Sequence, residues 1–198
     1  NGTRGYNQTQ TTFNISINSV NASRTVAFMT FGSCDGTSPA NTNEIFWTGN
    51  VTNSTNLEIR RDVSSVCDGN VSYFATEFND NSIIQQGQIA NVGTTSYAFV
   101  NEINQSNTWF YFSQASDATA AGIDDTSVIA EHFNTTAFRV SRQAAGGATR
   151  VQWYAITTSG AYVQNGTASY ASGSSRGSNV TISSLNINMS FSLHSFDN

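Results

Sequence analysis

The chain has 198 residues, of which 38% are hydrophobic and 12% aromatic, which is enough to bury a core and excludes a disordered chain. Only 11% of the residues are charged, and the formal net charge is −5 with no lysine present. The sequence therefore has no basic stripe for nucleic acid. It also has no apolar run of about 18 residues, the length of a membrane-spanning helix.

The first twelve residues form a polar segment that does not start with Met. Such a start is typical of a secreted chain whose signal peptide has been removed. We expect residues 1–12 to be extended. The chain then alternates apolar and polar residues at Phe13, Ile15 and Ile17, and this period of two is typical of a half-buried β-strand.

The same alternation recurs along the chain, and clusters of Gly, Ser, Asn and Asp separate one stretch from the next. Leu57 and Ile59 are a second clear example. Helical spacing is not sustained anywhere. Strands are expected within residues 11–21, 25–28, 53–61, 71–75, 84–87, 94–104, 108–111, 134–142, 151–155 and 163–166.

These stretches match one another in order when the sequence is shifted by about 80 residues, which indicates an internal repeat. A further copy starts near Asn179 and stops. We therefore predict an all-β, antiparallel β-sandwich or jelly-roll-like protein built from two tandem copies of about 82 residues and a partial third copy. The expected parts are the extended segment 1–12, copy one at 13–93, copy two at 94–177 and closing strands at 178–198.

Twelve Asn-x-Ser/Thr sequons occur, about twice the number expected from the residue frequencies. N-linked glycans on several of them would solubilise a surface that carries so little charge. The other reading is that a chain rich in Asn, Ser and Thr contains sequons by composition alone. The sequons begin at Asn1, Asn7, Asn14, Asn21, Asn50, Asn53, Asn70, Asn104, Asn134, Asn165, Asn179 and Asn188.

The two cysteines, Cys34 and Cys67, are expected to form one disulfide in an oxidising compartment. The sequence has no third cysteine and no Cys-x-x-Cys motif. It therefore predicts neither a redox site nor a cysteine-bound metal.

Acidic residues in the long loop of the second copy, Asp117, Asp124 and Asp125, are a weak candidate calcium site, although a solvated acidic loop is the simpler reading. We expect no other cofactor. The two histidines, His132 and His194, lie in no zinc or nucleophile motif. The sequence therefore predicts no catalytic residue and no enzyme.

Arg61 and Arg142 occupy equivalent positions in the two copies. We interpret them as structural caps that bind Glu77 or a backbone carbonyl. Five large aromatic residues are interpreted as core, with a sugar-binding platform as the alternative; they are Trp47, Tyr73, Trp109, Trp153 and Tyr154.

The surplus segments at both ends suggest how the chain associates. If the N-terminal segment left its own body and completed the sheet of the next molecule, the chain would polymerise head to tail by donor-strand complementation. The alternating residues of the candidate donor segment are Thr9, Thr11, Phe13, Ile15 and Ile17.

With these alternating strands and sequons, the chain resembles the secreted β-sandwich subunits of archaeal extracellular filaments, namely threads, bundling pili and cannulae. Phrases at residues 57–61 and 151–155 are similar to tandem β-repeats of large bacterial and archaeal surface proteins. The resemblance implies an extracellular, N-glycosylated structural subunit that binds copies of itself by strand donation. Two alternatives stay open: a carbohydrate-binding or adhesin module, and a viral capsid or spike protein.

Overall fold

A computed structural model describes residues 1–7, 9–30, 32–33, 45–63, 68–117, 126–143, 146–164 and 181–184. These residues form twelve strands in four three-stranded antiparallel sheets, with one 3-10 turn (η1) at Ala22–Arg24. The prediction of an all-β antiparallel protein is confirmed.

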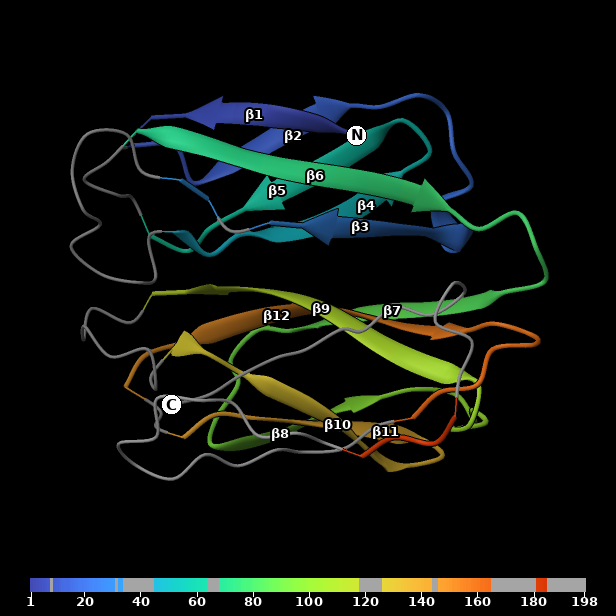
Figure 1. The fold of residues 1–198 in the computed structure, drawn as a ribbon. Helices are drawn as coiled ribbons and strands as arrows, with labels where there is room; N and C mark the ends of the chain where they lie inside the picture. The colour runs from blue at the N-terminus through green and yellow to red at the C-terminus, as the bar shows by residue number, and fades with distance from the viewer. Residues whose placement is uncertain are drawn as a thin grey trace.

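Strands β1 to β6 form the first six-stranded unit, in the upper half of Figure 1. Its two sheets have the strand orders β1-β6-β3 and β2-β5-β4. The strands are β1 (Gly2–Tyr6), β2 (Thr12–Ser16), β3 (Thr25–Met29), β4 (Thr48–Asn53), β5 (Asn56–Arg60) and β6 (Gly69–Glu77).

The second unit has the same organisation, because its sheets have the orders β7-β12-β9 and β10-β11-β8. Each strand therefore has a counterpart in the first unit, as β12 has in β6. The strands are β7 (Ile83–Ile89), β8 (Thr95–Phe99), β9 (Thr108–Ser116), β10 (Ile129–Asn134), β11 (Ala137–Ser141) and β12 (Thr149–Thr157).

Backbone hydrogen bonds in the connections repeat as well. The Phe78 N–H donates to the Arg24 carbonyl at 2.9 Å, and the Thr158 N–H donates to the Asn107 carbonyl at 3.1 Å in the second unit. Because loops vary more freely than strands, this agreement supports two copies of one unit more strongly than the sheet order alone.

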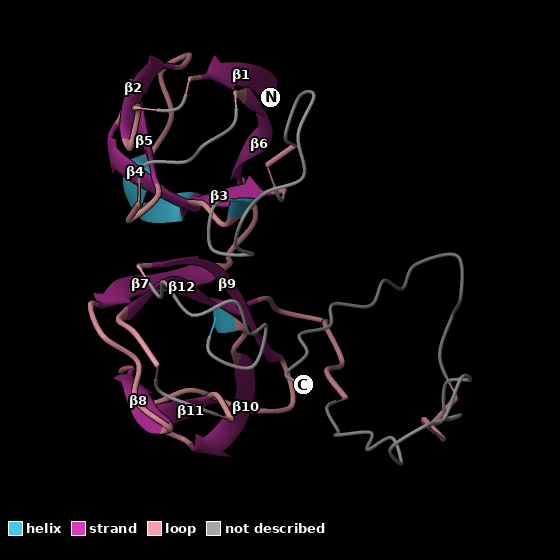
Figure 2. Ribbon diagram, turned by 90° about the vertical axis from the view of Figure 1, so that its left-hand side faces the viewer, coloured by secondary structure: helices cyan, strands magenta, loops and turns pink. Residues whose placement is uncertain are grey.

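The core of each unit lies between its two sheets, which face each other in Figure 2. Leu57 and Ile59 point inward from β5 and are fully buried, whereas Glu58 between them is half-buried. Each buried aliphatic side chain stabilises the fold by about 1.5–3 kcal/mol. The alternation of apolar and polar residues in the sequence therefore determines which face of the strand points into the core.

The outer face of the sheet β7-β12-β9 packs against the β3 and β4 edges of the first unit (Figures 1 and 2). Tyr154 and Ile156 of β12 are fully buried and belong to the same hydrophobic cluster as the core of the first unit. The hydrophobic contact between the units is thus continuous with the first core.

In each unit the first strand pairs with the last strand, and the local sequence does not reveal this pairing. β1 lies within the expected extended segment 1–12, and it pairs antiparallel with β6 of the same chain. β7 lies before the expected boundary at residues 93 and 94, yet it pairs with β12 of the second unit. Each unit therefore begins with the strand that borders its last strand.

Candidate functional site

The seam between β3 and β4 is where the first unit meets the second. These strands are edges of two different sheets and are not paired with each other. They approach closely, because a Cβ added at Gly49 would lie 2.4 Å from the Met29 sulfur. Backbone groups along such edges need partners when water is excluded.

Three hydroxyl groups of the second unit supply these partners. The Tyr111 hydroxyl accepts a hydrogen bond from the Met29 N–H at 2.7 Å, and Ser113 Oγ accepts from the Gly49 N–H at 3.1 Å. The Tyr154 hydroxyl donates to the Gly49 carbonyl at 3.0 Å. Side chains of one unit therefore seal the open edges of the other.

The two tyrosines remain protonated in this environment. Burial raises the pKa of Tyr111 to about 12, although the hydrogen bond with Met29 opposes the rise. Burial also raises the pKa of Tyr154 well above its ordinary value. Neutral hydroxyl groups are what the seam requires, because a buried phenolate could not donate to the Gly49 carbonyl.

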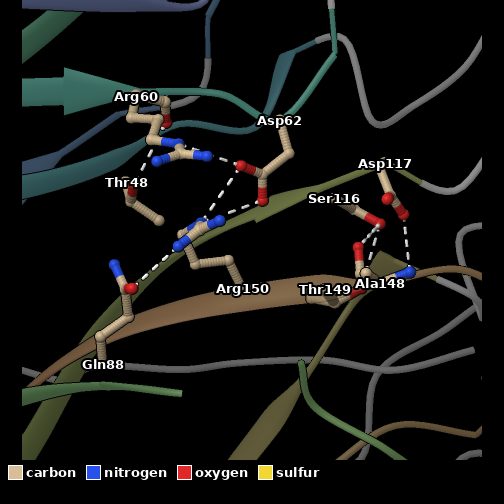
Figure 3. A network of polar contacts seen from close by, with 9 residues as sticks. All are labelled: Thr48, Arg60, Asp62, Gln88, Ser116, Asp117, Ala148, Thr149 and Arg150. Carbon is tan, nitrogen blue, oxygen red and sulfur yellow. Dashed lines mark hydrogen bonds and ion pairs between the residues drawn. The ribbon is translucent and has the colours of Figure 1, made fainter. Parts of the chain in front are cut away.

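An ion pair joins the units beside the seam, as Figure 3 shows. Arg150 Nε of β12 lies 3.1 Å from Asp62 Oδ1, and Arg60 Nε lies 3.2 Å from the same oxygen. Asp62 and Arg150 are largely buried, but Arg60 is substantially exposed. The pair across the units is therefore less screened by water than the pair within the first unit.

Arg61 and Arg142 act as structural caps on backbone carbonyls, which confirms one of the two partners expected from the sequence. Arg61 is fully buried and donates to the carbonyls of Gln10 at 2.8 Å and Asn7 at 2.9 Å. Arg142 donates to the Gly147 carbonyl. The equivalent arginines therefore hold different loops.

Aromatic rings enclose the Arg61 guanidinium, which lies 4.7 Å from the Tyr6 ring centroid and 4.8 Å from that of Trp47. Contacts of this kind stabilise a desolvated cation by about 2 kcal/mol. Because Tyr6 ends β1, the arginine fastens β1 and the loop after it to the core.

The candidate donor residues are part of the first unit. Phe13 is buried in β2 beside Trp47, and Ile15 packs against the same cluster. Thr9 donates to the Asn7 side chain, Thr11 accepts from the Arg61 N–H, and Ile17 donates to the Thr55 carbonyl. In this structure their partners belong to the same chain.

Five sequons adopt one shared geometry. In each, the side-chain oxygen of the asparagine accepts hydrogen bonds from both the N–H and the hydroxyl of the residue two positions later; the asparagines are Asn7, Asn21, Asn53, Asn104 and Asn134. This is the Asx-turn that starts a tight loop. All five asparagines are exposed. The hydrogen bonds give these sequons a role as turns, and glycosylation at them stays a prediction.

The remaining sequons lie elsewhere. Asn1 precedes β1, and Asn14, Asn50 and Asn70 lie in strands β2, β4 and β6, where alternation sends their side chains away from the core. Asn165, Asn179 and Asn188 lie outside the described residues. Glycosylation at any of these positions stays a prediction.

The turn role and the glycan role of Asn53 can be separated. Asn53→Asp keeps an oxygen acceptor for the Thr55 N–H, and Asn53→Ala removes it, whereas both changes remove the sequon. We expect Asn53→Ala to lower the free energy of unfolding of unglycosylated protein by about 1 kcal/mol and Asn53→Asp to lower it by less than about half of that. Urea unfolding measures the difference. Equal losses of unfolding free energy in both variants would show that the hydrogen bond of the turn is not the cause of the loss.

Cys34 and Cys67 themselves lie outside the described residues, but their neighbours are adjacent. The Ser33 N–H donates to the Asn70 carbonyl at 2.8 Å, and the Asn70 N–H donates to Ser33 Oγ at 3.0 Å. The chain entering Cys34 and the chain leaving Cys67 therefore run side by side.

We expect non-reducing peptide mapping to recover Cys34 and Cys67 in one disulfide-linked peptide pair. Reduction should lower the free energy of unfolding by about 3–4 kcal/mol, since the bond would close a long loop of the unfolded chain. Quantitative alkylation of both thiols in the native, non-reduced protein would show that the pair is not formed.

The other candidate sites are not assembled within the described residues. No cluster of three or more His, Cys, Asp or Glu side chains there is placed to hold a metal ion. Asp117 is exposed and accepts from the Ala148 N–H, and Asp124 and Asp125 lie outside the described part. The described residues also contain no helix long and apolar enough to cross a membrane.

His132 packs its ring against Phe138, with the centroids 4.6 Å apart, and burial lowers the pKa of this histidine. It is therefore a neutral, half-buried side chain at neutral pH. His194 lies outside the described residues.

The aromatic residues considered for a sugar platform are mostly core. Trp47, Trp153 and Tyr154 are buried, and Tyr73 and Trp109 are half-buried. The interpretation as core is thus confirmed for the first three.

A different set of rings lies on the surface, on the outer face of the sheet β10-β11-β8. Phe99 is 75% exposed, Phe133 52% and Tyr97 38%. The Tyr97 ring lies 4.9 Å from that of Phe133 and 6.3 Å from that of Phe99, measured between centroids. We refer to these three residues as the aromatic patch.

Sequence reasoning missed the roles of Tyr111 and Ser113 at the seam. A signal was available in the internal alignment, because Tyr111 and Tyr154 stand where the first copy has Phe28 and Phe74. A hydroxyl group added at two equivalent positions in only one copy indicates that this copy meets an additional polar partner.

Comparison of the chain with known protein families, with curated proteins and with solved structures finds no match.

Proposed function

We propose that the chain is a structural subunit of an extracellular or cell-surface assembly in which a sheet face of one β-unit stacks on the strand edges of the unit before it. The observation that carries this proposal is the seam, where hydroxyl groups of the second unit satisfy the edge backbone of the first. A unit of this kind is stabilised by the next unit, which is the property that a stacking module needs.

The described residues after β12 repeat one contact of the second unit. The Gln164 side chain accepts from the Ser183 N–H at 2.6 Å and donates to its carbonyl at 3.2 Å. Gln85 of the second unit makes the same two contacts with Asn101. This repeated contact supports the start of a third unit near residues 164 and 183. A second copy of the chain could then continue the stack head to tail.

Strand donation is the route by which we expect copies to join. Among the strands that the structure describes, β1 pairs with β6 alone, and of its five residues only Tyr6 is buried. Exchange of β1 between molecules would replace each hydrogen bond to β6 with an identical intermolecular one. The burial pattern favours β1 as the exchanged element, because Phe13 of β2 is part of the core.

Electron microscopy and light scattering of the native protein test the assembly, and a variant lacking residues 1–5 tests its cause. This deletion removes most of β1 but keeps Tyr6, Asn7 and Gln10, which bind Arg61. We expect filaments or long oligomers from the intact chain and their loss on deletion. Monomers from both proteins would overturn the assembly, whereas filaments from both would overturn only strand donation.

The aromatic patch favours a second candidate function, a carbohydrate-binding or adhesin module. Exposed rings on the outer face of a sheet offer apolar faces on which sugar rings stack. If the patch binds sugars, Phe99→Ser and Phe133→Ser should abolish binding on a glycan array. Tyr162→Ser is the matched control, because Tyr162 is 69% exposed and lies outside the patch. Unchanged binding in the patch variants would reject this function.

A further inference from the structure

A polar groove lies between the two units, with β4 on one side and β7 and β12 on the other. Its volume is about 490 Å³, within the range of small-molecule sites. Its lining residues are Asn50, Val51, Thr52, Gln86, Gly87, Gln88 and Gln152.

The lining is uncharged and rich in amides. Asn50 and the three glutamines each offer a carbonyl oxygen and an NH₂ group, and Thr52 adds a hydroxyl. An ionic ligand would find no counter-charge among these lining residues. A ligand with many hydroxyl groups would find paired donors and acceptors, because an amide can accept from one hydroxyl while it donates to its neighbour.

Gln152 is the most informative residue of the groove. Only 3% of its surface is exposed, and its side-chain amide makes no hydrogen bond with any residue that the structure describes. The Gln152 amide at the groove therefore keeps hydrogen-bonding capacity for water or for a bound molecule.

Gln88 faces Gln152 in the strand register, and both units hold it in place. Arg150 Nη1 donates to Gln88 Oε1 at 2.8 Å, and Arg150 Nε donates to both oxygens of Asp62 at 3.1 Å (Figure 3). With its oxygen engaged, the Gln88 amide keeps its NH₂ group for donation. The groove wall is thus arranged before any ligand arrives.

We propose that this groove binds a saccharide, whose neighbouring ring hydroxyls pair with the amides of Gln152, Gln88 and Gln86. The sugar has two possible sources with the same chemistry. One is the first residues of an N-linked glycan on Asn50, which lines the groove, and this source rests on the glycosylation of Asn50 expected from the sequence. The other is a saccharide from solution, which requires neither glycosylation nor assembly.

The solution source is tested with protein made in a host that adds no N-linked glycans. Glucose, mannose and N-acetylglucosamine are titrated separately into ¹⁵N-labelled protein, and the glutamine side-chain amide resonances are followed. We expect saturable shifts for Gln152 and Gln88. Gln152→Leu and the more exposed Gln86→Leu should each weaken binding about tenfold, the loss of roughly one hydrogen bond. Gln105→Leu, outside the groove, is the control and should have no effect.

The attached source is tested with glycosylated protein. If the glycan on Asn50 fills the groove, the Gln152 amide resonances should be shifted without added sugar, and Asn50→Asp should restore their unglycosylated positions. Asn53→Asp removes a nearby sequon outside the groove and should leave them unchanged. Absence of any groove shift in both materials overturns the proposal. Electron microscopy of Gln152→Leu separates this result from assembly, which we expect to persist.

Discussion

Arg61→Leu is expected to lower the free energy of unfolding by about 3–5 kcal/mol, one of the two largest effects of any single change in the chain. The leucine would remove the guanidinium that donates to the carbonyls of Asn7 and Gln10. It would also remove the cation from between Tyr6 and Trp47. Urea unfolding followed by tryptophan fluorescence measures the loss, because Trp47 reports on this region.

The neighbouring Arg60 provides the matched control. Its side chain is 43% exposed and pairs with Asp62 at 3.2 Å. We expect Arg60→Ala to cost less than about 1 kcal/mol, since exposed ion pairs contribute little. Arg61→Lys should fall between the two, because an ammonium group cannot reproduce the planar fork of the guanidinium. Equal losses for Arg60→Ala and Arg61→Leu would show that the buried cap is not stabilising.

Tyr154→Ala should cost about 3–5 kcal/mol and weaken the contact between the two units. The ring is fully buried between the units, and its hydroxyl is the donor to the Gly49 carbonyl. We expect the single unfolding transition of the intact protein to separate into two, because each unit then unfolds with less help from the other. Tyr154→Phe removes only the hydrogen bond and should cost about 1–2 kcal/mol.

Phe74 is the control, because it occupies the position of Tyr154 in the first unit but is 45% exposed. Phe74→Ala should cost less than about 1 kcal/mol and should leave one transition. A similar loss in both alanine variants would mean that the effect belongs to the repeat position. The comparison thus isolates burial between the units from everything that the repeat shares.

The strands that sequence predicted best are those with one buried face. β5 and β11 alternate clearly around Leu57 and Phe138, and both lie in the middle of a sheet. β1 could not be predicted in the same way, because residues 2–6 include two glycines and bury one side chain. Its pairing with β6 brings together residues far apart in the chain, and local propensity does not report such contacts.

The features of the candidate sites were harder to predict for the same reason. The alternation of Trp109, Tyr111 and Ser113 indicates a face of a strand, but not that the face meets another unit. The groove at Gln152 forms only when the two units pack together, so no local sequence motif predicts it. Arg61 was different, because its recurrence as Arg142 was visible in the repeat and indicated a structural role.

The seam also has a consequence for the order in which the protein is made. Synthesis finishes β3 and β4 long before the ribosome reaches Tyr111, Ser113 and Tyr154. The nascent first unit therefore carries unsatisfied edge groups at Met29 and Gly49 for as long as translation of the second unit takes. Open edges of this kind attract other strands. A ribosome pause before β12 would prolong that exposure, and a chaperone that binds extended chains would act at this stage of synthesis.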